Sequence, residues 1–213
     1  MRRLQAARRA PVSPATTTAG EGRARAVATD GSVLSGARLR TWRWAAVATA
    51  VLGLALDQIT KALAVTRLDP ADPPGYLGGL LHLQLLRNSG AAFSMGSGAT
   101  VVISLFAAAA LVVVAVVVLP RARHRWSLVA CGMLLAGVSG NLTDRLLRAP
   151  GVLRGHVVDF FALPHFAVFN VADIFITATA VLVIAMSFFG GDSASGKRPQ
   201  GSGGADDGRE GSR

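Results

Sequence analysis

Residues 101–119 read VVISLFAAAALVVVAVVVL, and this stretch decides the class of fold because it contains no ionisable side chain. A helix needs about 20 mostly apolar residues to cross the hydrocarbon core of a bilayer. Apolar stretches of similar length occur at about 42–64, 126–147 and 169–189. The sequence therefore predicts an all-α polytopic membrane protein with four transmembrane helices.

The composition agrees with a membrane domain flanked by polar tails. Of the 213 residues, 51% are hydrophobic and 16% are charged, whereas a soluble domain carries about 25% charged residues. The charges gather at the two ends of the chain, so we expect disordered cytoplasmic tails at 1–38 and 190–213 around a membrane domain at 39–189. The single cysteine, Cys131, lies in an apolar run and forms no intrachain disulfide.

The net charge of +10 raises the question of a nucleic-acid partner. Nine arginines precede Trp44, but no aromatic residue lies among them before Trp42. Nucleic-acid binders usually interleave basic and aromatic side chains, and a basic tail near a membrane is attracted to anionic lipid. We therefore expect membrane lipids as partners and no nucleic acid.

The distribution of arginine predicts the orientation of the four helices. Arginines precede the first helix, and Arg121, Arg123 and Arg125 fill the short connection after the second. The positive-inside rule places this connection and both termini in the cytoplasm. The loops at about 66–99 and 148–168 then face the extracytoplasmic side.

The first outer loop has the pattern of a small β-structure. Residues 81–85, LHLQL, alternate between apolar and polar side chains, as a half-exposed strand does. Glycines lie on both sides of this run. We expect residues 76–95 to form a small extracytoplasmic β-cap on the membrane surface.

Polar side chains in separate parts of the chain are expected to meet at one depth. Asp57 and Lys61 lie four residues apart in the outer half of the first helix, where they share a face and can neutralise each other. The remaining polar residues occupy the outer end of the third helix, the second outer loop and the start of the fourth helix: Asn141, Asp144, Arg145, Asp159, Asn170 and Asp173. This convergence predicts a functional site near the extracytoplasmic face.

The chemistry of this site depends on two of its carboxylates. A charged side chain inside a bilayer costs about 2.5–3.5 kcal/mol on insertion scales, which marks Asp159 and Asp173 as functional candidates. Two carboxylates that face each other across a water cannot both ionise easily. The charged one can activate the water, and the protonated one can stabilise an oxyanion. This is the chemistry of aspartic proteases.

Metal chemistry finds little support in the residue types present. Both glutamates lie in the tails, a His-Glu-x-x-His motif is missing, and the four histidines show no close ligand pairing. We therefore expect neither a metal ion nor another cofactor.

Five strings, in this order, resemble the signature of lipoprotein signal peptidase, also called signal peptidase II, over about residues 42–189. They are LDQITK at 56–61, RNSGAAFS at 87–94, GNLTDRL at 140–146, VVDFF at 157–161 and FNVADIFI at 169–176. The resemblance implies a monomeric enzyme of the bacterial plasma membrane, with four helices and an extracytoplasmic β-cradle. It implies a catalytic dyad of Asp159 and Asp173, and cleavage of prolipoproteins just before a diacylglyceryl-modified cysteine.

The supporting residues each have a structural and a functional interpretation. The Asp57–Lys61 pair either locks the first helix to its neighbours or contacts substrate. Asn88 with Gly90 either forms an ordinary turn or supplies an amide that positions the substrate. We expect the second of these roles. Asn170 is expected to orient an aspartate or the peptide.

The end of the third helix is expected to combine both kinds of role. Asp144 and Arg145 can pair with each other, while Asn141 and Arg145 can hold substrate carbonyls.

Two other functions compete with this interpretation. Residues 137–140, GVSG, match the pattern around the nucleophile of rhomboid-like serine proteases, with Ser139 as the nucleophile. No predicted helix has a histidine in its interior to serve as the base. A proton or ion carrier with aspartate relays is the second alternative, but the polar groups occupy only the outer half of the bundle.

Overall fold

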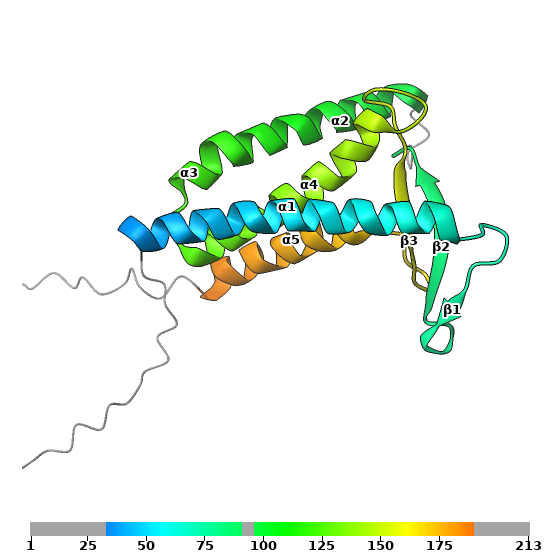
Figure 1. Ribbon diagram of the computed structural model, residues 1–213, viewed down its shortest axis with the longest axis horizontal. Helices are drawn as coiled ribbons and strands as arrows, with labels where there is room; N and C mark the ends of the chain where they lie inside the picture. Colours follow the sequence, from blue (N-terminus) through cyan, green and yellow to red (C-terminus); the bar gives the residue numbers. More distant parts are fainter. Residues whose placement is uncertain (1–32, 91–95, 190–213) are drawn as a thin grey trace, which may run out of the picture. The chain divides into compact units, whose positions relative to one another are not determined.

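The computed structural model describes residues 33–90 and 96–189 (Figure 1). Four of its helical segments are long and apolar enough to cross a membrane, which confirms the predicted all-α membrane fold. They are α1 (Gly36–Arg67), the continuous run of α2 (Gly96–Val113), η2 (Val114–Val118) and α3 (Leu119–Arg121), then α4 (Arg125–Leu147) and α5 (Val171–Phe189). The two predicted tails, apart from residues 33–38, and the end of the predicted cap at 91–95 lie outside the described residues.

Helix α1 is longer than its apolar stretch, since it begins six residues before Trp42 and continues to Arg67. Its buried residues recur at intervals of three, four or seven, which is the spacing of one helical face. They are Leu39, Ala46, Gly53, Asp57, Lys61 and Ala64. The same face that packs the helix into the bundle therefore also carries an aspartate and a lysine.

Helix α4 lies at the centre of the bundle, where it packs most extensively against α1 and α5 and also contacts α2. Glycines permit this close packing. A Cβ atom at Gly132 would lie 2.7 Å from the Ala46 carbonyl oxygen of α1, and one at Gly137 would lie 2.6 Å from the Ala172 carbonyl oxygen of α5. Because such distances are shorter than real contacts, only glycine lets α4 approach both neighbours at these points.

A three-stranded antiparallel sheet in the order β1-β2-β3 lies at the end of α1 that carries Arg67 (Figure 1). Strands β1 (Gly75–Tyr76) and β2 (Leu81–Asn88) form the predicted β-cap. A third strand, β3 (Val157–Ala162), was not expected, because the second outer loop was predicted without secondary structure. Its register pairs Asn88 with Val157 and Leu86 with Asp159, so the sheet joins both outer loops.

Candidate active site

Asp159 lies in β3, where it is almost completely buried, with 1% of its surface exposed. The Asn88 side-chain amide donates to its Oδ2 at 2.9 Å, and the Asn170 amide donates to its Oδ1 at 2.5 Å. Burial raises the pKa of the Asp159 carboxyl, and the negative charge of Asp173 adds to this effect, while the two amide hydrogen bonds oppose it. Strand pairing thus carries a buried carboxylate, with a raised pKa, to the start of α5.

Asp173 is the third residue of α5 and forms a reciprocal pair with Asn170. The Asn170 Oδ1 accepts from the Asp173 backbone N–H at 3.1 Å, and the Asp173 Oδ2 accepts from the Asn170 backbone N–H at 3.2 Å. This arrangement is a capping box, which fixes the first turn of a helix. The other oxygen of Asp173 accepts from the Asn141 amide at 2.8 Å. Asp173 therefore has a structural contact on one oxygen and an active-site contact on the other.

Asn170 connects the two aspartates directly, because it binds Asp159 through its side chain and Asp173 through its side chain and backbone. Its amide also donates to Asn141 Oδ1 at 3.2 Å. The expectation that Asn170 orients an aspartate agrees with these contacts. Asn141 lies against Asp173, Asn170 and Lys61, so its proposed contact with substrate stays a prediction.

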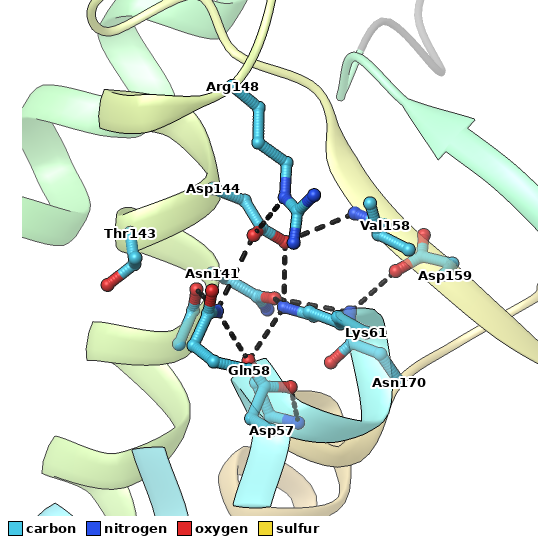
Figure 2. Close-up of polar contacts among 12 residues, drawn as sticks. Asp57, Gln58, Lys61, Asn141, Thr143, Asp144, Arg148, Val158, Asp159 and Asn170 are labelled. Carbon is cyan, nitrogen blue, oxygen red and sulfur yellow. Dashed lines mark hydrogen bonds and ion pairs between the residues drawn. The ribbon is translucent and has the colours of Figure 1, made fainter. Parts of the chain in front are cut away.

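Lys61 is completely buried, and Figure 2 shows its ammonium group between the carboxylates of Asp57 and Asp144. Its Nζ lies 2.9 Å from Asp57 Oδ2, 2.9 Å from Asp144 Oδ2 and 3.0 Å from Asn141 Oδ1. These three acceptors match the three N–H groups of an ammonium ion. The predicted Asp57–Lys61 pair is confirmed, and it belongs to a larger cluster of Asp57, Lys61 and Asp144, here called the lysine cluster.

Each carboxylate of the lysine cluster also holds the backbone next to a candidate catalytic residue. Asp57 Oδ1 accepts from the N–H of Ala172 at 2.9 Å, directly before Asp173. Asp144 Oδ2 accepts from the N–H of Val158 at 3.1 Å, directly before Asp159. One lysine therefore joins two anchors, and each anchor positions one of the two aspartates.

The predicted pairing of Asp144 with Arg145 is wrong. Asp144 pairs instead with Arg148, whose Nε lies 2.6 Å from its Oδ1, and with Lys61. Helical geometry explains this result, because residues four apart share a face while adjacent residues point about 100° apart. Arg148 is not among the predicted site residues, although its i+4 spacing from Asp144 is the signal that could have identified it.

Gln58 was also assigned no role from the sequence. Its amide donates to Asp57 Oδ2 and the Gly140 carbonyl, both at 3.1 Å, beside the lysine cluster (Figure 2). A Cβ atom at Gly140 would lie 2.6 Å from Asp57 Oδ2. Glycine at this position therefore makes room for the carboxylate.

Among the described residues, Arg145 makes no ion pair within 4 Å with its sequence neighbour Asp144. Its charge interacts with those of Asp159, Asp144 and Asp173. Its Nη1 is buried and has no hydrogen-bond partner among residues 33–90 and 96–189. An unpaired buried N–H group is costly unless an acceptor reaches it, and the expectation that Arg145 holds a substrate carbonyl stays a prediction.

The turn after β2 brings Asn88 and Gly90 to the site. Asn88 Oδ1 accepts from the Gly90 backbone N–H at 2.8 Å, which leaves its amide free to bind Asp159. Gly90 has a φ of 76°, and a Cβ there would lie 3.1 Å from Ile103 and 3.5 Å from Arg145. Asn88 thus forms an ordinary Asx turn and also holds an aspartate; its role as a substrate-positioning amide stays a prediction.

The GVSG pattern at 137–140, which suggested a serine protease, has a structural explanation. The Ser139 hydroxyl donates to the Ala136 carbonyl of its own helix at 3.1 Å. The glycines on either side of it serve the packing of α4 against α5 and Asp57.

For metal binding, the part of the chain with defined structure contains no group of three or more His, Cys, Asp or Glu side chains arranged to hold an ion.

Residues 49–189 match the family model described as signal peptidase (SPase) II. The lipoprotein signal peptidase of Mycolicibacterium smegmatis is 45% identical over 144 residues, which cover 67% of this chain and 60% of that protein. The lipoprotein signal peptidase of Mycobacterium avium is 48% identical over 140 residues, which cover 65% of this chain and 76% of that protein. The chain thus spans about three fifths of the first relative and about three quarters of the second.

The fold also resembles two solved structures. A bacterial membrane enzyme solved by the in meso method at 1.9 Å resolution is 27% identical, with a TM-score of 0.61, and the match covers 68% of this chain and 94% of that one. A second bacterial membrane enzyme, solved by the same method at 2.3 Å, is 26% identical, with a TM-score of 0.63, over 74% of this chain and 95% of that one. The similarity extends across nearly the whole of both solved chains.

Proposed function

Because this chain belongs to the signal peptidase II family, a family of membrane peptidases, we propose that it is an aspartic endopeptidase that removes signal peptides from prolipoproteins. The observation that carries the proposal is the convergence of Asp159 and Asp173 on Asn170. Asn170 binds the first at 2.5 Å through its side chain and forms a capping box with the second. Two carboxylates that share one asparagine partner, one of them almost completely buried, are suited to be the pair that aspartic proteolysis needs.

Asp159 is assigned as the acid of the pair, because its burial favours the protonated form. Asp173 is only partly buried and lies in the first turn of α5, which leaves it as the proposed base of the pair. In the reaction, Asp173 takes a proton from water as the water oxygen bonds to the scissile carbonyl carbon. Asp159 donates a hydrogen bond to the developing oxyanion, which Arg145 also stabilises. The C–N bond then breaks, and the leaving amine takes up the proton.

The proposed substrate is a prolipoprotein with a diacylglyceryl group on the cysteine after the cleavage site. Four apolar helices make the chain a multi-pass membrane protein, and the site lies at the end of the bundle that carries the sheet. A site at this depth accepts a lipid-anchored peptide while its acyl chains remain in the bilayer. The arginine distribution supports cytoplasmic termini and an extracytoplasmic site, and the bacterial relatives support a location in the plasma membrane.

Cleavage of a synthetic diacylated prolipoprotein peptide by the purified chain tests this function. We expect mass spectrometry to show a single cut directly before the lipidated cysteine. The same peptide without its diacylglyceryl group is the matched control and should remain uncut. Ser139→Ala should cleave at the wild-type rate, and its inactivation would support the serine-protease alternative. Ion flux through liposomes without any cleavage would support a carrier.

The pH profile tests the assignment of Asp159 as the acid. The Asn88 amide favours the ionised form of Asp159, so Asn88→Ala should raise the pKa of that carboxyl further. Asp159 would then keep its proton to a higher pH, and the alkaline limb of kcat/KM should move upward. The control is Gln84→Ala, which removes an exposed amide from the same strand. An alkaline limb that stays in place or moves to lower pH would contradict the assignment.

A further inference from the structure

The charges of the described residues are divided unequally between the two ends of the bundle. All six carboxylates lie toward the sheet, together with six of the twelve lysine and arginine side chains. The other six basic residues lie at the opposite end, on the start of α1 and around the connection from α3 to α4. They are Arg38, Arg40, Arg43, Arg121, Arg123 and Arg125. This end, here called the arginine end, carries positive charge that no carboxylate of residues 33–90 and 96–189 neutralises.

The arginine end is a connected piece of structure. The Leu34 N–H donates to the Arg123 carbonyl at 2.8 Å, and an Arg43 guanidinium N–H donates to the Pro120 carbonyl. Leu34, Leu39, Ala46 and Leu128 form a buried apolar cluster beneath these contacts. The start of α1 and the α3–α4 connection are therefore held together, and they bring arginines from both segments to one end.

Two of these arginines have a buried donor with no partner. The Nε atoms of Arg43 and Arg125 are buried and make no hydrogen bond among residues 33–90 and 96–189, although both side chains are partly exposed. Only one other side-chain donor of these residues shares this property, the Arg145 Nη1 beside the aspartates. Since a buried guanidinium N–H needs an acceptor, the two Nε–H groups indicate a ligand that carries oxygen acceptors.

The tryptophans indicate where this ligand comes from. All three tryptophans of the chain are sequence neighbours of the two arginines: Trp42 precedes and Trp44 follows Arg43, and Trp126 follows Arg125. Trp44 and Trp126 are exposed, and the Arg125 guanidinium lies 5.1 Å from the centre of the Trp126 ring. Tryptophan gathers at the level of the lipid headgroups. We therefore expect the two unpaired donors to lie at the depth of the lipid headgroups.

We propose that Arg43 and Arg125 form a binding site for the phosphate of an anionic phospholipid. A guanidinium presents a fork of N–H donors that matches phosphate oxygens, and basic pockets between membrane helices bind anionic headgroups. The lipid neutralises the uncompensated charge of the arginine end and supplies the acceptors that the two Nε–H groups lack. The site is separate from the aspartates and serves to fix the start of α1 to the α3–α4 connection.

Native mass spectrometry of the full chain, released from micelles with equal amounts of phosphatidylglycerol and phosphatidylcholine, tests the proposal. We expect the wild type to retain phosphatidylglycerol in preference, and Arg43→Gln and Arg125→Gln each to lose this preference. Arg38→Gln and Arg40→Gln are matched controls, because they remove the same charge from exposed side chains at the same end. They should retain the lipid like the wild type.

Thermal unfolding with the same lipids gives an independent measurement. Phosphatidylglycerol should raise the Tm of the wild type and leave the Tm of Arg43→Gln unchanged, while inorganic phosphate should raise neither. Equal losses in all four variants would show diffuse attraction to charge and overturn the site. Equal retention in all four, or no preference in the wild type, would also overturn it.

Discussion

Replacing either Asp159 or Asp173 with asparagine is expected to lower the rate of prolipoprotein cleavage by about 10³-fold or more. The reason is that asparagine can neither accept the proton of water nor donate a carboxyl proton to the oxyanion, and general acid–base catalysis contributes about 10²–10⁴-fold. The measurement is kcat for the diacylated peptide with purified variants. Since the two carboxylates act as one unit, the double variant should be no slower than the slower single variant.

The exposed carboxylate of Asp72 provides a matched control for these two variants. Asp72→Asn makes the same chemical change in the turn between α1 and β1 and should leave kcat unchanged. The Asp173→Asn protein should remain folded, because an asparagine oxygen can still accept from the Asn170 N–H in the capping box. Full activity of both aspartate variants would contradict the dyad.

Replacing Lys61 with methionine is expected to have the largest effect on stability. Lys61 is completely buried between Asp57 and Asp144, at 2.9 Å from each. Its loss leaves buried carboxylates without their common partner, and removing one member of a buried ion pair costs about 3–5 kcal/mol. We expect a large fall in the Tm of the purified protein and, with it, in the amount of active enzyme recovered from membranes.

A charge-balanced double variant separates the loss of charge from the loss of shape. In Lys61→Met with Asp57→Asn, one negative charge leaves together with the positive one. Asp144 keeps Arg148 at 2.6 Å, and the new asparagine can still accept from the Ala172 N–H. The double variant should therefore recover part of the lost stability. A single Lys61→Met variant with unchanged Tm would contradict the role of the lysine cluster.

The four spans were predictable because a bilayer imposes a simple requirement on length and apolarity, which runs such as 101–119 satisfy without any tertiary information. The Asp57–Lys61 pair was predictable for a similar reason, since helical spacing alone brings these residues together. Strand β2 was identified from alternation. These are local features, and one segment of sequence is sufficient to recognise each of them.

Strand β3 and the anchors of the lysine cluster were not predictable in this way. The string VVDFFA of β3 does not alternate, because its first four residues are all buried, on both faces of the strand. Its pairing with β2 joins residues about 70 positions apart. The contacts of Asp57 with Ala172 and of Asp144 with Val158 use backbone N–H groups, which every residue type except proline carries. Side-chain identity gives no sign of such contacts.

The use of main-chain donors has a consequence for how this sequence can change over evolutionary time. Positions 158 and 172 are fully buried, so drift at either is limited by the volume of the replacement and by the requirement for an amide hydrogen. No particular side-chain chemistry is demanded there. Asp57 and Asp144, which bind these two N–H groups, have no such freedom. Between distant relatives, we therefore expect more substitutions at positions 158 and 172 than at Asp57 and Asp144.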